Sequence, residues 1–229
     1  MKKSLTVALI LSSLIIAACG KKNEQNTASS DAAPATPAAE SAAASPSASE
    51  SAEPSADAEE RAKKQAMLDY ATMEDNYIQD SHAQWASTAK ASSTFGDDDG
   101  KEPSPSNLAS NATGAVDGNT WTNNKQDIGF DWLEAGFAKP VNATEVRIVF
   151  PNGDGVEAVS KVELQDTQGK WNTVWSGLSD VKEDNRGRRT WFVKTFEKTP
   201  YQANAVKVTI ANNVQSGYKV IDAVQLVGE

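Results

Sequence analysis

One stretch of the chain lacks the side chains from which a hydrophobic core is built. Residues 28–60 contain only Ala, Ser, Pro, Thr, Asp and Glu, so no aliphatic side chain there is larger than that of Ala. Such a segment cannot bury enough apolar surface to offset the entropy lost on folding. We therefore expect residues 19–56 to form a disordered tether, and we expect the core to lie after it.

The first eighteen residues have the pattern of a secretory signal peptide. Lys2 and Lys3 precede an apolar run over residues 5–18 that is too short to span a bilayer comfortably. Residues 14–20, LIIAACG, resemble the lipobox of bacterial lipoproteins. The resemblance implies cleavage before Cys19, a diacylglycerol on its sulfur, and an acyl chain such as palmitate on the new amino terminus. Several acyl chains together give stable membrane anchoring.

The residue after the cysteine bears on the destination of the chain. Gly20 stands where an Asp would be the usual inner-membrane retention signal of a Gram-negative cell. The resemblance therefore implies an anchor in the outer membrane. The alternative is an ordinary signal peptide followed by a coincidental cysteine. Because Cys19 is the only cysteine, the chain can form neither an intramolecular disulfide nor a cysteine-built zinc site.

A helix is predicted over residues 57–82, before the texture of the chain changes. Asp57, with Glu60 three residues later, is typical of an N-cap with its capping partner. Helical spacing places an apolar stripe on one face: Ala62, Ala66, Tyr70, Met73 and Tyr77. The short stripe favours a helix that packs on the following domain, and a short oligomerising helix is the alternative.

From residue 83 onward, short alternating runs predict about eight strands separated by polar turns. Separate strands are expected over residues 132–137 and 144–150. In the second of these, Val146, Ile148 and Phe150 share one face. Residues 189–196 are apolar on both faces, which indicates a central strand. The pattern predicts an all-β antiparallel sandwich or barrel over residues 83–229.

Five segments, in chain order, carry a resemblance to one family of domains. They are residues 85–96, 110–121, 132–141, 162–175 and 221–228. Together they resemble discoidin-like, galactose-binding-like (F5/8 type C-like) jelly rolls, and SNATGAVDGNTW is similar to that family's N-A-x-D-G-x-x-x-T-x-W segment. The resemblance implies a jelly-roll sandwich that binds glycans, lipids or proteins through variable loops at one end, without catalysis.

The loop over residues 183–191 is the strongest candidate for ligand binding. Arg186, Arg188 and Arg189 cluster there beside Trp191, in an acidic chain. Guanidinium groups bind carboxylates, phosphates or sugar hydroxyls, and an indole can stack on a sugar face. The alternative is a solvated hairpin turn with Trp191 in the core. Polar residues of other predicted loops are outer candidates: Asn152, Asp154 and Tyr218.

A second loop has the oxygen ligands of a structural Ca²⁺ site in many members of that family. Its candidate ligands are Asp117, Asn119 and Thr120. The resemblance also implies a carboxylate near Ala223 on the closing strand. Asp222 lies one residue away, and a shift of one residue turns a strand side chain to the other face. The alternative is an Asx turn beside a core tryptophan.

The net charge of −9 argues against a sequence-independent nucleic-acid binder. Neither G-x-S-x-G nor H-E-x-x-H is present, and the only imidazole, His82, falls at a predicted domain boundary. The leading hypothesis is an outer-membrane-anchored lipoprotein whose non-catalytic sandwich binds envelope or extracellular carbohydrate. One alternative is an assembly lipoprotein that docks another envelope protein. A more remote one is a small glycosidase using a carboxylate pair.

Overall fold

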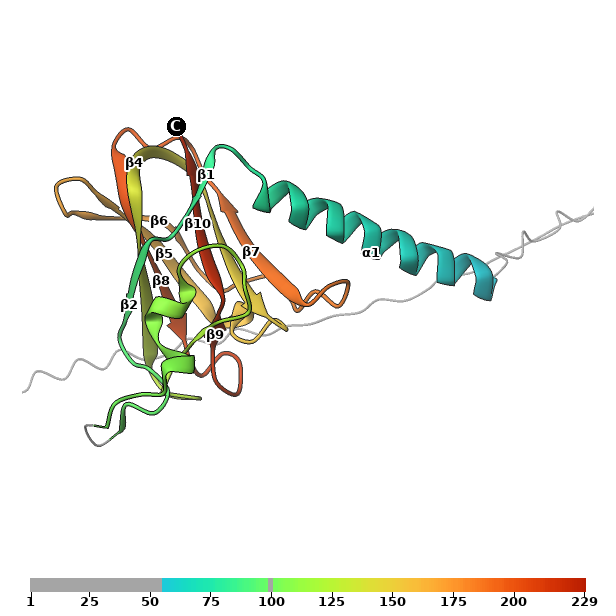
Figure 1. The fold of residues 1–229 in the computed structure, drawn as a ribbon, viewed down its shortest axis with the longest axis horizontal. Helices are drawn as coiled ribbons and strands as arrows, with labels where there is room; N and C mark the ends of the chain where they lie inside the picture. The colour runs from blue at the N-terminus through green and yellow to red at the C-terminus, as the bar shows by residue number, and fades with distance from the viewer. Residues whose placement is uncertain (1–54, 99–100) are drawn as a thin grey trace, which may run out of the picture. The chain divides into compact units, whose positions relative to one another are not determined.

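The computed structural model describes residues 55–98 and 101–229 (Figure 1). The predicted signal peptide, Cys19 and all but the end of the predicted tether lie outside the described residues. Within the described part, no helix combines the length and the apolar character needed to cross a membrane.

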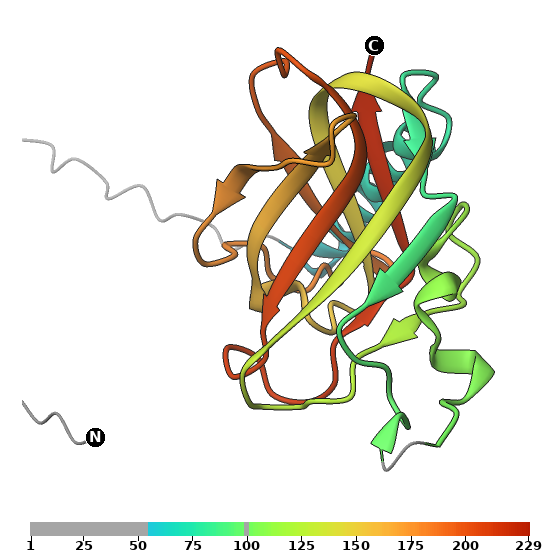
Figure 2. The same ribbon diagram turned by 90° about the vertical axis from the view of Figure 1, so that its left-hand side faces the viewer.

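Two antiparallel layers make up the domain (Figures 1 and 2). The five-strand layer contains β2 (Thr88–Ala91), the first part of β4 (Phe130–Pro151), β8 (Gln202–Ala211), β5 (Val159–Asp166) and β6 (Trp171–Ser176). The four-strand layer contains β1 (Ala83–Trp85), β10 (Ala223–Gly228), the last part of β4 and β7 (Arg189–Thr195). A short ladder joins β3 (Trp121–Thr122) to β9 (Val220–Ile221). The predicted antiparallel β-sandwich is confirmed.

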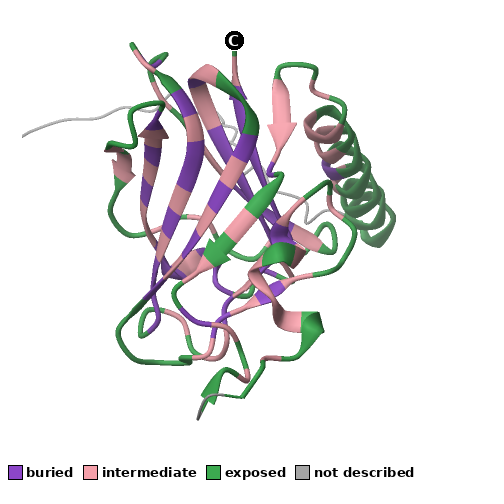
Figure 3. Cartoon of the chain, turned by 60° about the vertical axis from the view of Figure 1, so that its left-hand side comes forward, coloured by how far each residue is buried: buried purple, intermediate pink, exposed green. Residues whose placement is uncertain are grey.

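Alternating side chains from both layers form one core. Val146, Ile148 and Phe150 are fully buried and share a face, as predicted. They pack in one cluster with apolar residues of the five-strand layer, including Leu133 and Leu164. Figure 3 shows buried residues along the strands of both layers, whereas most of the helix surface is exposed.

Strand β4 passes from one layer to the other. Its residues 130–136 pair with β8, and its residues 145–151 pair with β7. The prediction of two separate strands was wrong, because residues 138–143 continue the extended chain across the turn between layers. The closing run is instead divided, since Asp222 falls between β9 and β10.

Strand β7 lies at an edge of its layer and pairs only with β4, so the prediction of a central strand was wrong. Its two apolar faces have different partners. Phe192 belongs to the core between the layers, whereas Trp191 packs with Tyr70 and Tyr77 of the helix. A strand can therefore be apolar on both faces because a helix covers the second one.

Helix α1 spans Ala56–Ile78 and packs its C-terminal half on the four-strand layer (Figure 1). Ser55 is its N-cap and accepts a hydrogen bond from the amide of Ala58, so Asp57 lies inside the first turn instead of capping it. Of the predicted stripe, Tyr70 is buried and Met73 is partly buried, while Ala62 is exposed. The stripe therefore meets the sandwich only from about residue 66 onward.

A buried carboxylate fastens the loops at the end of the sandwich opposite the C-terminus. Asp131 is fully buried and accepts four side-chain hydrogen bonds of 2.7–3.0 Å, from Ser92, Ser93, Asn123 and Asn212. Burial alone would raise the pKa of Asp131, but these hydrogen bonds outweigh it and hold the pKa below its ordinary value. The carboxylate therefore ties the ends of β2, β3 and β8 to β4.

A buried ammonium group lies near the same loops. Lys219 is fully buried, and its Nζ donates to the backbone carbonyl oxygens of Gln126 and Gly217. Burial lowers the pKa of Lys219. The paired carbonyl groups and the nearby carboxylates offset part of the cost of burying this charge.

Candidate functional site

Three strand ends lie together at one end of the four-strand layer. Pro151 at the end of β4 pairs with Arg189 at the start of β7, and Val149 pairs with Ala223 at the start of β10. The residues that flank these ends therefore converge. They line an open cavity of about 350 Å³, here named the strand-end pocket: Asp117, Gly118, Pro151, Asn152, Arg188, Arg189 and Asp222.

The floor of the strand-end pocket is an ionic bridge between the sandwich and the helix. The Nε of Arg189 lies 3.5 Å from Oδ2 of Asp222, and its Nη1 lies 3.1 Å from Oε1 of Glu74 on α1. Burial raises the pKa of Asp222, although Arg189 and the backbone amide of Asp117 act in the opposite direction. Arg189 is therefore held in place by two carboxylates from different elements.

The rim of the pocket is built differently. Asn152 has φ of 50°, a left-handed conformation that Asn tolerates better than most residues, and its amide donates to the carbonyl of Arg188 at 3.0 Å. Arg186 and Arg189 are ion-paired, whereas Arg188 is exposed and has no ionic partner in the described part of the chain. The rim thus offers the guanidinium of Arg188 and the side-chain amide of Asn152 as hydrogen-bonding groups, since the backbone amide of Asn152 is already bonded.

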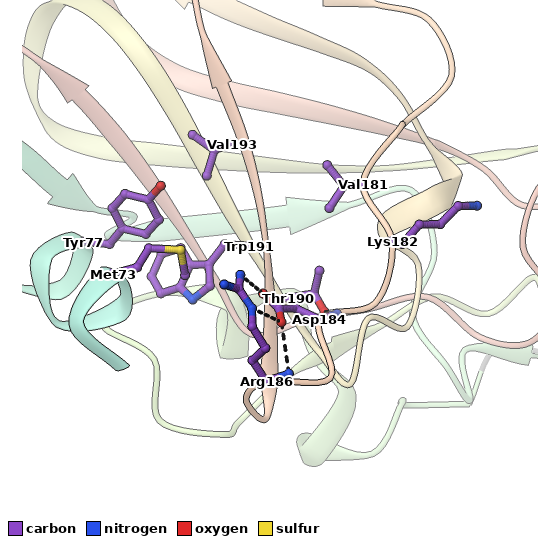
Figure 4. Close-up of a pocket in the computed structure, with 9 residues that line it drawn as sticks. All are labelled: Met73, Tyr77, Val181, Lys182, Asp184, Arg186, Thr190, Trp191 and Val193. Atoms are coloured by element: carbon purple, nitrogen blue, oxygen red, sulfur yellow. Dashed lines mark hydrogen bonds and ion pairs between the residues drawn. The ribbon is translucent and has the colours of Figure 1, made fainter. Parts of the chain in front are cut away.

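We name the segment over residues 183–191 the arginine loop, and its other half faces helix α1 (Figure 4). Arg186 makes two hydrogen bonds to the carboxylate of Asp184, at 2.9 and 2.7 Å. Trp191 is only 7% exposed, its ring lies 5.1 Å from that of Tyr77, and its indole N–H donates to Glu74. These residues border a narrow groove of about 140 Å³ between α1 and the loop.

The packing of Trp191 bears on its predicted role in sugar stacking. With α1 docked, the indole is covered and no pyranose ring can lie on it. The structure instead fits the alternative hypothesis, in which Trp191 is a core residue, because it packs in one cluster with Tyr70 and Val149. The arginine loop separates the groove from the strand-end pocket, so Arg186 and Trp191 do not join Arg188 and Arg189.

Tyr70 ties the helix to the base of the arginine loop. Its hydroxyl donates to the carbonyl oxygen of Arg189 at 2.7 Å. Burial, reinforced by the neighbouring Glu74 carboxylate, raises the pKa of Tyr70 to about 12. The neutral phenol is therefore the form that suits the docked helix.

The two remaining binding candidates lie outside the pocket. Burial raises the pKa of Asp154, with a further contribution from Glu183. Tyr218 packs edge-on against Phe95, with ring centroids 4.7 Å apart. Of the seven residues predicted to bind a ligand, the structure brings Asn152, Arg188 and Arg189 together in one cavity.

The predicted calcium ligands form an Asx turn. Both carboxylate oxygens of Asp117 accept hydrogen bonds of 2.8 Å from Asn119, and the carbonyl of Thr120 accepts one from Asn111. No group of three or more His, Cys, Asp or Glu side chains suited to a metal occurs in residues 55–98 and 101–229. Trp121 beside this turn is fully buried.

The expected orientation of Asp222 was also wrong. Its carboxylate accepts a hydrogen bond from the amide of Asp117, so it faces this loop. Alternation along a strand does not apply, because the strand is interrupted at this residue. Sequence reasoning also missed Glu74 as a partner of Arg189. The available signal was its place four residues after Tyr70, beside the apolar stripe.

The comparisons with known proteins concern the sandwich. No family model matches the chain, and no curated protein matches it significantly. Similar solved structures include the family 32 carbohydrate-binding module of Clostridium perfringens NanJ in complex with galactose. It is 22% identical with a TM-score of 0.43, and the match covers 65% of this chain and 96% of that one.

Two further solved structures show comparable likeness. The CBM32 of AlyQ, in complex with 4,5-unsaturated mannuronic acid, is 18% identical with a TM-score of 0.44, over 62% of this chain and 97% of that one. CBM32-3 from a family 31 glycoside hydrolase of Clostridium perfringens is 14% identical with a TM-score of 0.46, over 65% and 92%. The fold is defined by the antiparallel strand pairing of its two layers.

Proposed function

We propose that this protein is a non-catalytic carbohydrate-binding lipoprotein whose strand-end pocket binds a sugar residue of an envelope or extracellular glycan. The convergence of Asn152 and Arg188 from separate loops into one open polar cavity carries the proposal. A pyranose presents several hydroxyl groups, each a donor and an acceptor. The exposed guanidinium of Arg188 donates to their oxygens, and the exposed side-chain amide of Asn152 both donates and accepts.

The arrangement of the pocket favours binding over hydrolysis. A glycosidase uses one carboxyl group as an acid and a second as a base or nucleophile. In this pocket, the carboxylate of Asp222 is paired with Arg189, and that of Asp117 is bound by Asn119. Both carboxylates are therefore already engaged in holding the loops.

Replacing Arg188 by Ala is expected to weaken sugar binding by about 10- to 100-fold, the effect of losing hydrogen bonds from a charged donor. The measurement is calorimetry on the detergent-purified full chain, with galactose, N-acetylglucosamine and galacturonate. The matched control is Arg186→Ala, which removes an arginine of the same loop outside the pocket and should change affinity less than twofold. Equal affinities of the Arg188→Ala and wild-type chains, or no binding of any of these sugars, would contradict the proposal.

We also propose that the acylated Cys19 anchors the chain in the outer membrane and that residues 19–56 hold the sandwich away from it. Mass spectrometry of the mature chain should find an N-terminus at Cys19 with a diacylglyceryl group on its sulfur and an acyl group on its amine. The chain should partition into the detergent phase of a cloud-point separation. An unmodified Cys19 sulfur, or a mature chain that begins elsewhere, would rule out this anchor.

A further inference from the structure

The two layers of the sandwich differ in what covers their outer faces. Helix α1 lies over the four-strand layer, whereas no described element covers the outer face of the five-strand layer (Figure 2). Two tryptophans project from that uncovered face. Trp132 of β4 alternates with the buried Asp131 and Leu133, and Trp171 lies at the start of β6. Both indoles are only half-buried.

A lysine lies between the two indoles. The Nζ of Lys207 on β8 is 3.8 Å from the ring centroid of Trp171 and 5.6 Å from that of Trp132. The two rings therefore converge on one ammonium group and hold it by cation–π attraction. We name Trp132, Trp171 and Lys207 the sheet platform.

The ammonium of Lys207 keeps hydrogen-bonding capacity. Its nearest carboxylate oxygen, Oε2 of Glu134, lies at 3.8 Å, while Lys90 lies at 2.7 Å from the other oxygen of that carboxylate. The contact with Glu134 is the one ion pair of this Nζ in the described part of the chain, it is longer than a hydrogen bond, and the lysine side chain is 21% exposed. An ammonium group has three N–H donors, so an anion reaching the platform meets unused ones.

The unbalanced charge on this face is opposite in sign to the net charge of the chain. Three lysines and two glutamates point outward from its central rows: Lys90, Lys161, Lys207, Glu134 and Glu163. Lys90 pairs with Glu134 and Lys161 pairs with Glu163, so Lys207 carries the unbalanced positive charge of this face in a chain whose net charge is −9. A positive group on this surface attracts an anionic ligand more strongly than a neutral one.

We propose that the sheet platform is a second binding surface, which takes a carboxylate-bearing pyranose chain. The apolar C–H face of a pyranose ring packs on an indole, and its carboxylate pairs with Lys207 between the two rings. A uronic-acid ring carries both features in one unit. The platform shares no residue with the strand-end pocket, so the two proposals stand or fall separately.

The test titrates the full chain carrying Arg188→Ala, which removes the contribution of the strand-end pocket. The probes are a galacturonate hexamer, the same hexamer with its carboxyl groups reduced, and polyglutamate. We expect the galacturonate hexamer to bind at least tenfold more tightly than the other two and to change tryptophan fluorescence. Adding Lys207→Met should weaken this binding at least tenfold without changing the melting temperature, and Lys207→Arg should retain most of it.

The matched control is Lys161→Met, which removes the same charge from the same face but away from the indoles. Its nearest acid, Glu163, lies at 3.1 Å, and we expect less than a twofold loss. Three results would overturn the proposal. They are unchanged binding in the Lys207→Met chain, an equal loss in the Lys161→Met chain, and equally tight binding of polyglutamate or the reduced hexamer.

Discussion

Replacing Gly187 by Ala is expected to release helix α1 from the sandwich. A Cβ atom at this position would lie 2.1 Å from Cε1 and 2.3 Å from Cζ of Tyr70. The phenol ring cannot yield, because it is buried and its hydroxyl is bonded to Arg189. Overpacking of this kind costs about 1–3 kcal/mol. Because the clashing ring cannot move, we expect a cost in the upper part of this range, which lowers the equilibrium constant for docking more than tenfold.

Release of α1 should expose two sites of proteolysis. Chymotrypsin cleaves after aromatic residues, and in the docked helix Tyr70 is buried while Tyr77 is partly buried. We expect the Gly187→Ala chain to be cleaved at these tyrosines at least tenfold faster than the wild type. In a Tyr70→Ala background the same substitution should add little, since the ring that it meets is gone. Equal cleavage rates in the Gly187→Ala and wild-type chains would contradict this account of docking.

Replacing Asp131 by Ala is expected to lower the free energy of unfolding by about 3–5 kcal/mol. The donors that share this carboxylate in the wild-type chain would remain buried without an acceptor. For a domain of this size, the melting temperature should fall by about 10 °C. Thermal unfolding followed by circular dichroism measures the effect. Asp180→Ala is the control, since that carboxylate is largely exposed, and it should change the melting temperature little.

The same carboxylate sets a pH dependence. Its pKa in the folded chain is below the ordinary value, so its contribution to stability is complete above about pH 4–5 and is lost as pH falls through the folded pKa. The wild-type melting temperature should therefore fall more steeply below pH 4 than that of the Asp131→Ala chain. Parallel acid curves for the two chains would show that Asp131 is not ionised in the fold.

The features that were predicted correctly are those encoded by neighbouring residues. Alternation in residues 144–150 placed Val146 and Ile148 in the core without knowledge of their partners. The apolar stripe of the helix likewise identified Tyr70 as a packing residue. Strands of two or three residues, such as β1 and β3, carry too little periodicity to be recognised, since they exist only through pairing with distant strands.

The binding residues were harder to assign because their roles depend on contacts between distant segments. Arg186 and Trp191 lie within three residues of Arg188 in the sequence, yet they border the helix-side groove whereas Arg188 lines the strand-end pocket. Residue spacing in a loop does not fix which way each side chain points. Arg189 contacts both Glu74 and Asp222, and neither partner could be recognised without the docked helix and the interrupted strand.

The most direct test of the central claim is to locate a bound sugar on the full chain by nuclear magnetic resonance. The sugar of the calorimetric panel with the highest affinity is titrated into ¹⁵N-labelled protein. The account predicts that the Nε–Hε signal of Arg188 and the side-chain amide of Asn152 shift in a saturable manner, while the Nε–Hε signal of Arg186 stays in place. Saturable shifts elsewhere, with Arg188 and Asn152 unmoved, would contradict the assignment of the strand-end pocket as the sugar site.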